Sequence, residues 1–373
     1  MNKTSVCCIY NSAPHYRRGI FLKMDDEFDC KFVFGKYPIG SKDIKQIPQN
    51  HLKNCKIINN CVFIKAPFYW QNNVLIELFN GYKDYLILGE PYCISTWIFL
   101  LITRFIPSKR VFLWTHGWYG REGKLKTIVK KTFFKLCDGI FTYGNYAKNL
   151  MMKEGIPSNK ISVIHNSLDY KSQLPIRNNL IESDIYKKHF KNNNPVLIFI
   201  GRLTESKKLD MALKAMSILK EQFIPLNFVI IGNGGIKDVL SDLTKKLGLQ
   251  ENVWFYGACY NELENANLIY NADICISPGN IGLTAIHSMM FGCPCITHSD
   301  FPYQGPEFEA ISEGITGSFF ENNNIESLAN SIKQWIKNSK DRQIIRNNCY
   351  NQIDLYWTPD FQIKALKERL QKR

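Results

Sequence analysis

A basic segment between a predicted strand and a predicted helix offers the most explicit chemistry in this sequence. Residues 201–207 read Gly-Arg-Leu-Thr-Glu-Ser-Lys, after the apolar run 196–200 and before the helical stretch 209–222. A helix N-terminus presents free backbone N–H groups and positive partial charge, which attract anions. Arg202 adds a planar fork of donors, and Lys207 adds a point charge. These features predict a diphosphate-binding site, with a solvated basic turn as the alternative.

A glycine-rich turn further along the chain has a similar character. Residues 277–287 read Ser-Pro-Gly-Asn-Ile-Gly-Leu-Thr-Ala-Ile-His, and a helix is predicted to begin near Leu283. Glycine lets a ligand phosphate approach both the backbone and the helix N-terminus. His287, about one turn into this helix, could reach a ribose hydroxyl, although a structural histidine is the alternative. The turn is therefore a second candidate for phosphate binding.

The hydrophobic pattern indicates the elements that must position these segments. In the second half, mainly apolar runs alternate with helical stretches; the runs are 196–201, 228–232, 253–257, 273–277 and 294–298. The first half repeats the pattern less regularly, at 6–10, 30–34, 85–88, 111–115, 139–142 and 161–164. Strands that are apolar throughout predict parallel sheets buried on both faces. The predicted fold class is α/β, with two doubly wound domains and a ligand crevice between them at the strand carboxyl ends.

Length and composition agree with two folded domains. The chain has 373 residues, of which 45% are hydrophobic and 21% charged, and this excludes a disordered protein. The polar stretch 171–194 is the predicted hinge, between an N-terminal domain at 1–170 and a C-terminal domain at 171–355. The start of the chain lacks the layout of a signal peptide, and the 12 cysteines lack zinc-binding spacing. Buried free thiols in a reducing compartment, the cytosol, are expected.

Positive charge is confined to the first half of the chain. The formal net charge is +14; residues 1–180 carry 26 Lys and Arg against 12 Asp and Glu, whereas residues 181–373 carry 21 of each. Such a field attracts a polyanion: nucleic acid, anionic lipid or a lipid-linked diphosphate. Residues 121–135 predict a basic amphipathic helix suited to an anionic bilayer, with a core helix as the alternative. The apolar run 92–102 is too short to span a bilayer and is predicted to be a buried helix.

The order of these motifs resembles that of the family-4 glycosyltransferases, which have the GT-B fold. The matching segments of the second half are Gly-Arg-Leu at 201–203 with Lys207, Ile-Gly-Asn-Gly at 231–234, Phe-Tyr-Gly at 255–257, Ala-Asp at 272–273, Gly-Leu at 282–283 and Phe-Gly-Cys-Pro at 291–294. Those of the first half are Thr-His-Gly at 115–117 and Val-Ile-His-Asn-Ser-Leu-Asp at 163–169. Each motif alone is weak, but their order and spacing over 114–320 are fairly specific.

The resemblance implies a role for each matching residue. Arg202 and Lys207 would hold the donor diphosphate and stabilise the charge of the leaving group. His116, at the end of a strand, would be a third catalytic residue facing the donor sugar. Glu309 would be the acidic residue before a later glycine turn, with Glu307 as the competing choice. The implied donor-binding set is Gly201, Arg202, Lys207, Gly279, Asn280, Ile281, Gly282, Leu283, Thr284, His287 and Glu309.

Two features depart from the family pattern. The family usually places two glutamates eight positions apart, where this chain has Gly279 and His287. A neutral imidazole can bond a ribose diol, so His287 would replace the second glutamate, but nothing obvious replaces the first. The usual glycine-rich N-terminal loop reads Asn-Ser-Ala-Pro-His-Tyr-Arg-Arg-Gly at 11–19. Arg17 or Arg18 is predicted to meet the acceptor's phosphate.

The resemblance also implies a reaction and its partners. It implies a retaining enzyme without a cofactor or metal, and the acidic residues at 25–27 are interpreted as a solvated turn rather than a metal site. The implied partners are a UDP- or GDP-sugar donor, a lipid-diphosphate-linked saccharide acceptor and an anionic membrane surface, without nucleic acid. A helix at about 356–373 is expected to pack back on the N-terminal domain. The implied location is cytoplasmic, peripheral on the inner face of the membrane, in capsule or O-antigen synthesis.

Three other functions compete with this interpretation. The missing glutamates favour a non-catalytic relative that binds a nucleotide-sugar without turnover. A sugar-nucleotide epimerase of the GT-B fold would act on the donor without an acceptor. Nucleic-acid binding is the weakest alternative, because the basic half contains no recognisable recognition module.

Overall fold

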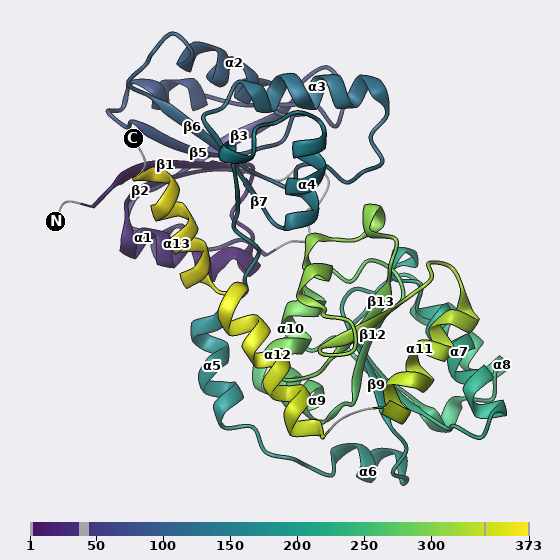
Figure 1. The fold of residues 1–373 in the computed structure, drawn as a ribbon. Coiled ribbons are helices and arrows are strands. Elements are labelled where there is room, and N and C mark those ends of the chain that lie inside the picture. The colour runs from purple at the N-terminus through teal and green to yellow at the C-terminus, as the bar shows by residue number, and fades with distance from the viewer. Residues whose placement is uncertain (1–2, 37–44, 339–340, 372–373) are drawn as a thin grey trace. The chain divides into compact units, whose positions relative to one another are not determined.

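The computed structural model describes residues 3–36, 45–338 and 341–371 of the chain. The chain forms two compact units (Figure 1). Unit 1 comprises residues 1–170 and 358–373, and unit 2 comprises residues 171–357. Each unit is built around its own sheet, and the chain returns to unit 1 for its last helix.

The described part of unit 1 contains an eight-stranded sheet in the order β4-β3-β2-β1-β5-β6-β7-β8. Its strands pair in parallel, apart from the antiparallel pair β3 and β4. The strands are β1 (Ser5–Tyr10), β2 (Asp29–Lys36), β3 (Cys55–Val62), β4 (Tyr69–Gln71), β5 (Asp84–Leu88), β6 (Arg110–Thr115), β7 (Gly139–Thr142) and β8 (Ile161–Val163). The strand order reverses between β1 and β5, which is where doubly wound sheets bind ligands.

Helices cover both faces of this sheet, because successive residues of a strand point to opposite sides. Cys8 of β1 belongs to a buried cluster with Phe21 and Leu366, whereas its neighbour Ile9 belongs to a second cluster with Phe99 and Phe133. The first cluster includes α1 (Arg18–Glu27) and α13 (Pro359–Leu370). The second includes η3 (Val74–Phe79), α2 (Ile94–Thr103), α3 (Lys124–Lys135) and α4 (Asn145–Lys153).

Within unit 1, polar contacts join the last helix, α13, to two other segments. Lys367 pairs with Glu27 of α1 at 2.6 Å. Gln362 donates from Nε2 to the carbonyl of His165 at 2.9 Å and accepts from the Ser167 hydroxyl at 2.6 Å. The segment 163–169, which resembles a family motif, therefore holds the returning helix.

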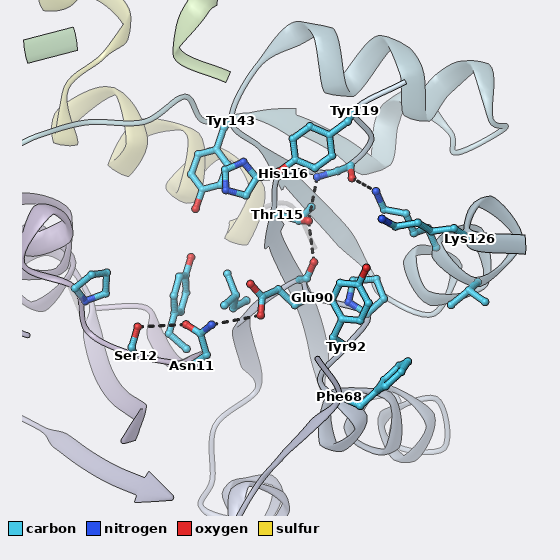
Figure 2. Close-up of a pocket in the computed structure, with 18 of the residues that line it drawn as sticks. Asn11, Ser12, Phe68, Glu90, Tyr92, Thr115, His116, Tyr119, Lys126 and Tyr143 are labelled. Atoms are coloured by element: carbon cyan, nitrogen blue, oxygen red, sulfur yellow. Dashed lines mark hydrogen bonds between the residues drawn. The ribbon is translucent and has the colours of Figure 1, made fainter. Parts of the chain in front are cut away.

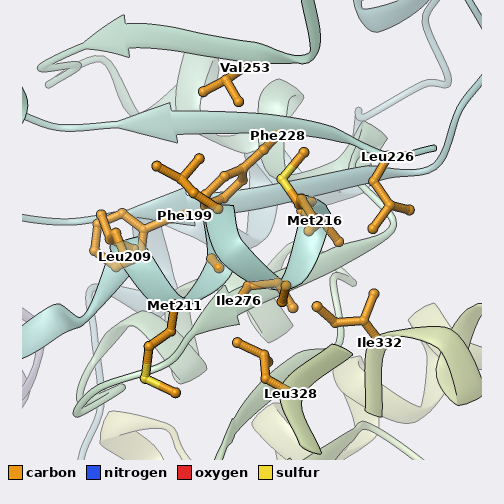
Figure 3. Close-up of a cluster of buried hydrophobic side chains, with 14 of the residues drawn as sticks. Phe199, Leu209, Met211, Met216, Leu226, Phe228, Val253, Ile276, Leu328 and Ile332 are labelled. Carbon is orange, nitrogen blue, oxygen red and sulfur yellow. The ribbon is translucent and has the colours of Figure 1, made fainter. Parts of the chain in front are cut away.

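The described part of unit 2 contains a six-stranded parallel sheet in the order β11-β10-β9-β12-β13-β14, with its reversal between β9 and β12. The strands are β9 (Val196–Ile200), β10 (Asn227–Ile231), β11 (Val253–Gly257), β12 (Ile274–Ser277), β13 (Cys295–His298) and β14 (Gly317–Phe320). The helices are α5 (Tyr170–Asn178), α6 (Ile185–Phe190), α7 (Leu209–Glu221), α8 (Lys237–Lys246), α9 (Glu262–Asn271), α10 (Thr284–Met290), α11 (Ile325–Asn338) and α12 (Arg342–Tyr356). Figure 3 shows the buried cluster in which Phe199 and Phe228 of the sheet meet α7 and α11.

The predicted α/β architecture is confirmed, but several local predictions are wrong. Strands β3, β4 and β14 were not predicted. The polar stretch 171–194, predicted as the hinge, begins at the boundary between the two units but contains the helices α5 and α6. The acidic residues at 25–27 are the last turn of α1 and not a solvated turn; Asp25 is buried and accepts the Lys53 backbone N–H at 3.1 Å.

The predicted buried helix at 92–102 is confirmed in part, and the predicted free thiols are confirmed. Most of the run 92–102 lies in α2 (Ile94–Thr103), which buries Phe99 and Leu100 but leaves Leu101 exposed. Within the described ranges, no helix combines the length and apolar character that crossing a bilayer requires. Nine of the 12 cysteines are buried and all 12 are free thiols, as predicted, with Cys61 exposed.

Candidate functional site

A pocket of about 780 Å³ lies where the strand order of the unit 2 sheet reverses. The loops after β9 and β12 supply most of its wall, and His298 and Tyr303 supply the rest. The residues of the two loops are Gly201, Arg202, Thr204, Ser206, Lys207, Lys208, Gly279, Asn280, Ile281, Gly282, Leu283 and Thr284. The predicted donor-binding residues thus line one cavity, the unit 2 pocket, except for His287 and Glu309.

Close backbone packing joins the two loops. The Gly279 N–H donates to the carbonyl of Lys207 at 3.0 Å. A Cβ at position 279 would lie 1.9 Å from the carbonyl oxygen of Ser206, so no side chain fits there. The glycine that replaces the family's first glutamate is therefore required by the packing of these loops.

Positive charge gathers on one side of the unit 2 pocket. Arg202 is exposed, whereas Lys207 is half-buried and donates to the carbonyl of Asn280. Burial lowers the pKa of Lys207; the charge of Glu307 acts to raise it and that of Arg202 lowers it further. Lys208 instead bonds the side-chain oxygens of Asn322 and Asn323, at 3.0 and 2.6 Å. Arg202 and Lys207 are thus the cations that can hold a diphosphate from this side.

A buried histidine at the end of β13 completes this wall. Burial and the charge of Lys208 lower the pKa of His298 to about 4, although Asp300 opposes the shift. Its imidazole is therefore neutral at pH 7, and Nδ1 accepts the Asp300 backbone N–H at 3.2 Å. The remaining ring nitrogen is a candidate donor to a ligand in the unit 2 pocket.

His287 and Glu309 do not line the unit 2 pocket. His287 Nε2 lies 2.9 Å from a carboxylate oxygen of Glu262 in α9, which also accepts from Gln173 at 2.7 Å. Glu309 and Glu307 both lie in η8 (Pro306–Ala310). Glu307 is buried, and a Cβ on Gly305 beside the glycine turn would meet its carboxylate at 2.7 Å. The same Cβ would lie 3.2 Å from the Cα of Gly282, so Glu307 lies close to the glycine turn that forms the pocket.

Unit 1 has a pocket of its own, of about 590 Å³, where its strand order reverses between β1 and β5. The loops after β1, β5 and β6 line this unit 1 pocket, together with one side of α3. Figure 2 shows its aromatic side chains Phe68, Tyr92 and Tyr119 with the carboxylate of Glu90. Glu90 accepts from the Tyr69 hydroxyl at 3.0 Å and from the Asn11 amide at 3.3 Å.

His116, a predicted catalytic residue, lines the unit 1 pocket directly after β6. Its ring lies 4.7 Å from that of Tyr143 between ring centroids. Desolvation by the surrounding wall, and the charges of Arg17 and Lys130, lower the pKa of His116 to about 4. A neutral His116 can exchange hydrogen bonds with a ligand at pH 7 but does not bring a positive charge.

The two arginines predicted to meet the acceptor differ in their surroundings. Arg17 lines the unit 1 pocket, but its guanidinium is buried, bonds the Tyr143 hydroxyl and lies within 5.3 Å of the ring centroids of Tyr10, Trp114 and Tyr143. Arg18 does not line the pocket and pairs with Asp169 at 2.7 Å. Among the described residues Nη1 of Arg17 has no hydrogen-bond partner, and the contact of either arginine with an acceptor phosphate stays a prediction.

Sequence reasoning missed Glu90 and His298, although one signal pointed to both. Glu90 stands two residues after β5, and His298 is the last residue of β13. Ligands of doubly wound sheets bind at the carboxyl ends of the strands, so polar residues at those ends were candidates. Across the described residues, no group of three or more His, Cys, Asp or Glu is arranged to hold a metal ion.

Comparison with known proteins finds a family similarity in the second half of the chain. Residues 181–352 match the family model of glycosyl transferases group 1. An uncharacterized glycosyltransferase of Methanocaldococcus jannaschii is 25% identical over 209 residues, which cover 53% of this chain and 50% of that relative. The poly(ribitol-phosphate) alpha-N-acetylglucosaminyltransferase of Staphylococcus aureus is 25% identical over 179 residues, 46% of this chain and 35% of the relative. The chain thus spans half or less of the length of these two curated relatives.

Structural similarity extends over the whole chain. HepE of Anabaena, solved in complex with UDP, has a TM-score of 0.73 at 15% identity and covers 99% of this chain and 100% of its own. Both units are Rossmann-like α/β domains whose strands pair in parallel, apart from β3 and β4. The chain therefore has the GT-B fold, and residues 181–352 are similar to the glycosyl transferases of group 1.

Proposed function

We propose that this protein transfers a sugar from a nucleoside-diphosphate sugar, with UDP or GDP as the nucleotide, to a lipid-diphosphate-linked saccharide. The unit 2 pocket carries the proposal, because Arg202 and Lys207 meet the glycine turn there at the ligand-binding end of a parallel sheet. The group 1 match covers both segments, and the HepE structure contains UDP.

The proposed chemistry consists mainly of positioning and charge stabilisation. The bond between the anomeric carbon and the donor diphosphate breaks, and the hydroxyl oxygen of the acceptor bonds to that carbon. The proton of the acceptor hydroxyl passes to the departing diphosphate. Arg202 and Lys207 stabilise the negative charge that develops on the diphosphate, and His116 donates a hydrogen bond to the donor sugar. The configuration at the anomeric carbon is retained. Since two cations supply the positive charge, the proposed reaction uses no metal and no other cofactor.

The proposed acceptor is held at an anionic membrane, on its cytoplasmic face. Helix α3 supports this, because it buries Phe133 and Phe134 while Leu125 is 76% and Ile128 is 61% exposed. Lysines at 124, 126 and 135 are exposed beside these apolar side chains, a combination that suits a helix lying on an anionic bilayer. Lys130 was predicted to share this basic side, but it is buried and pairs with Glu122 at 2.6 Å. Capsule or O-antigen synthesis fits such a reaction.

A transfer assay tests the proposed function. The full chain is incubated with a panel of UDP- and GDP-sugars, with or without a short-chain polyprenyl-diphosphate sugar, and release of the nucleoside diphosphate is measured. We expect acceptor-dependent release from one donor. Nucleotide binding without release from any donor would favour a non-catalytic relative. Conversion of a donor without an acceptor would favour a sugar-nucleotide epimerase.

Two neighbouring lysines provide a matched pair of variants for this assay. Lys207→Met is expected to lower the transfer rate about 10²–10³-fold, the usual effect of removing one group that stabilises transition-state charge. Lys208→Met is expected to change it by only a few fold, because the Lys208 ammonium bonds Asn322 and Asn323. Equal losses in both variants would contradict the assignment of the diphosphate to Lys207.

A further inference from the structure

One buried amide side chain of unit 2 joins the glycine turn after β12 to the end of β13. Gln304 is 3% exposed and directly follows the short helix η7 (Phe301–Tyr303). Its Oε1 accepts the backbone N–H of Ile281 at 3.0 Å. Its Nε2 donates to the Thr297 hydroxyl oxygen at 2.8 Å and to the carbonyl of His298 at 3.1 Å.

The surroundings of Gln304 allow one orientation of its amide. The hydrogen bonds of Nε2 are all made to oxygen atoms, including the carbonyl oxygen of Gly279 at 3.5 Å. Turning the amide by 180° would place Oε1 against the carbonyls of His298 and Gly279. It would also place the Nε2 hydrogens against the N–H of Ile281. The oxygen of the amide is therefore held on the glycine turn.

The N–H group that Gln304 accepts belongs to the same peptide group as a carbonyl that bonds Lys207. Nζ of Lys207 donates to the carbonyl of Asn280, and the N–H of Ile281 is the other side of that peptide group. In a planar trans peptide the C=O and N–H point in opposite directions, so a bond to one fixes the direction of the other. Gln304 thus holds the Asn280 carbonyl toward the Lys207 ammonium. If the peptide turned over, the ammonium would face an N–H group.

Aromatic packing fixes the segment that carries Gln304. The ring of Phe301 stacks on that of Phe308 with the centroids 4.2 Å apart, and it contacts Phe319 of β14 edge to face at 5.3 Å. The backbone N–H of Gln304 bonds the carbonyl of Phe301 at 3.0 Å. Because its own segment is packed in place, the amide of Gln304 is a rigid support for the glycine turn.

We infer that Gln304 is a positioning residue of the unit 2 pocket, and that it places the Lys207 ammonium through the peptide group of Asn280 and Ile281. This inference rests on the proposed function, in which Lys207 bonds the donor diphosphate. An ammonium has three N–H donors, and the Asn280 carbonyl accepts from one of them. The direction of that carbonyl therefore sets where the other two point in the pocket. Gln304 does not line the pocket, so it acts without touching the ligand.

A double-mutant cycle on nucleotide binding tests the inference without a donor sugar or turnover. UDP and GDP are titrated calorimetrically into the full chain as wild type, Gln304→Met, Lys207→Met and the double variant. Methionine keeps the length of the side chain but offers no oxygen to the Ile281 N–H. We expect each single variant to bind the preferred nucleotide about tenfold or more weakly, because a charge-assisted hydrogen bond to the diphosphate is lost or misdirected. The double variant should bind about as weakly as Lys207→Met, because Gln304 acts through Lys207.

A matched control and a second variant complete the test. Gln222→Met makes the same chemical change at an exposed glutamine, whose side chain accepts from Lys333 at 2.7 Å, and it should leave nucleotide binding unchanged. Gln304→Asn keeps an amide but is one methylene shorter, so it cannot reach both the Thr297 hydroxyl and the Ile281 N–H. It should weaken binding in the wild-type background and not in Lys207→Met. Thermal unfolding of each variant shows whether it is folded.

Three results would overturn the inference. They are unchanged nucleotide binding in folded Gln304→Met, additive losses in the double variant, and no binding of UDP or GDP to the wild-type protein. Additive losses would mean that Gln304 supports the pocket as a whole and not the Lys207 ammonium. Failure of the proposed function has a different signature. The cycle would give the expected non-additive losses, but no donor would be turned over in the transfer assay.

Discussion

Three buried or pocket-lining histidines are neutral at pH 7, and because of them the free energy of unfolding depends on pH. Burial lowers the pKa of His165 and of His298 to about 4, and His116 in the unit 1 pocket has a similarly lowered pKa. An unfolded histidine titrates near 6.5. Between pH 6.5 and 4 the unfolded chain therefore binds more protons than the folded chain, and acidification through this range favours unfolding.

We predict that the free energy of unfolding falls as the pH is lowered from 7 to 5. The expected loss is about 2 kcal/mol for each of the buried residues His165 and His298, and less for the more exposed His116. Urea unfolding at both pH values measures it. His298→Asn keeps an acceptor for the Asp300 N–H but cannot be protonated, so its unfolding should depend less on pH. The same pH dependence in this variant and in the wild-type protein would show that His298 does not contribute.

Single residues also mark how far the sequence could predict the site. Arg202 and Lys207 were found because their types and their spacing after an apolar run carry a signal. His287 lies outside the unit 2 pocket because its ring contacts Glu262. This contact joins α9 and α10, and no local sequence pattern predicts it. Glu90 was missed because a lone glutamate after a strand is common. Its significance comes from the aromatic side chains of distant segments, such as Phe68 and Tyr119, that gather around it.

Among the secondary-structure elements, the strands with apolar runs were predictable, including the edge strands β8 and β11, whereas β3, β4 and β14 were not. β1, β5, β9 and β12 are buried on both faces and are nearly continuous apolar runs. β3 is mixed in polarity, reading Cys-Lys-Ile-Ile-Asn-Asn-Cys-Val; it lies next to the edge strand β4, and of its residues only Ile58 is buried. β4 and β14 are also short, and they read Tyr-Trp-Gln and Gly-Ser-Phe-Phe, so polar residues and glycine leave no continuous apolar run.

The loops after β9 and β12 form one structural element of the unit 2 pocket, and Gly279 is where they meet. We predict that Gly279→Ala lowers the free energy of unfolding by about 1–3 kcal/mol, the usual cost of overpacking. Since the added Cβ would lie 1.9 Å from the Ser206 carbonyl, the loop that carries Lys207 must also move. UDP and GDP binding should therefore weaken together with stability. Urea unfolding and nucleotide titration measure the two effects.

Gly235 provides the matched control for this substitution. It lies in the loop after β10, is exposed, and has open space where a Cβ would be added. Gly235→Ala should therefore leave both stability and nucleotide binding close to those of the wild-type protein. If Gly279→Ala behaved like Gly235→Ala, the two loops would have to be less tightly packed than the structure indicates.

At the scale of the whole molecule, the charge asymmetry follows the two units. Unit 1 carries 29 Lys and Arg against 14 Asp and Glu, whereas unit 2 carries 18 against 19. The last 16 residues, which return to unit 1, add to its positive charge. The proposed membrane-facing unit is thus strongly basic, while the unit with the proposed donor pocket is nearly neutral. Anionic lipid would attract one unit of the molecule in preference to the other.

We predict salt-sensitive binding of the full chain to vesicles that contain anionic lipid, and weak binding to neutral vesicles. Each lysine near an anionic surface contributes about 1 kcal/mol, so replacing four lysines of α3 with glutamine should weaken binding at least tenfold. The four are Lys124, Lys126, Lys131 and Lys135. The control variant has the same net charge as the α3 variant, because four lysines of unit 2 are replaced with glutamine instead. These are Lys220, Lys237, Lys245 and Lys246. Vesicle co-sedimentation over a range of salt concentrations measures all three proteins. Equal losses of vesicle binding in the two variants would mean that net charge alone drives the attraction. Vesicle binding that depends on neither lipid charge nor salt concentration would contradict an electrostatic role of α3.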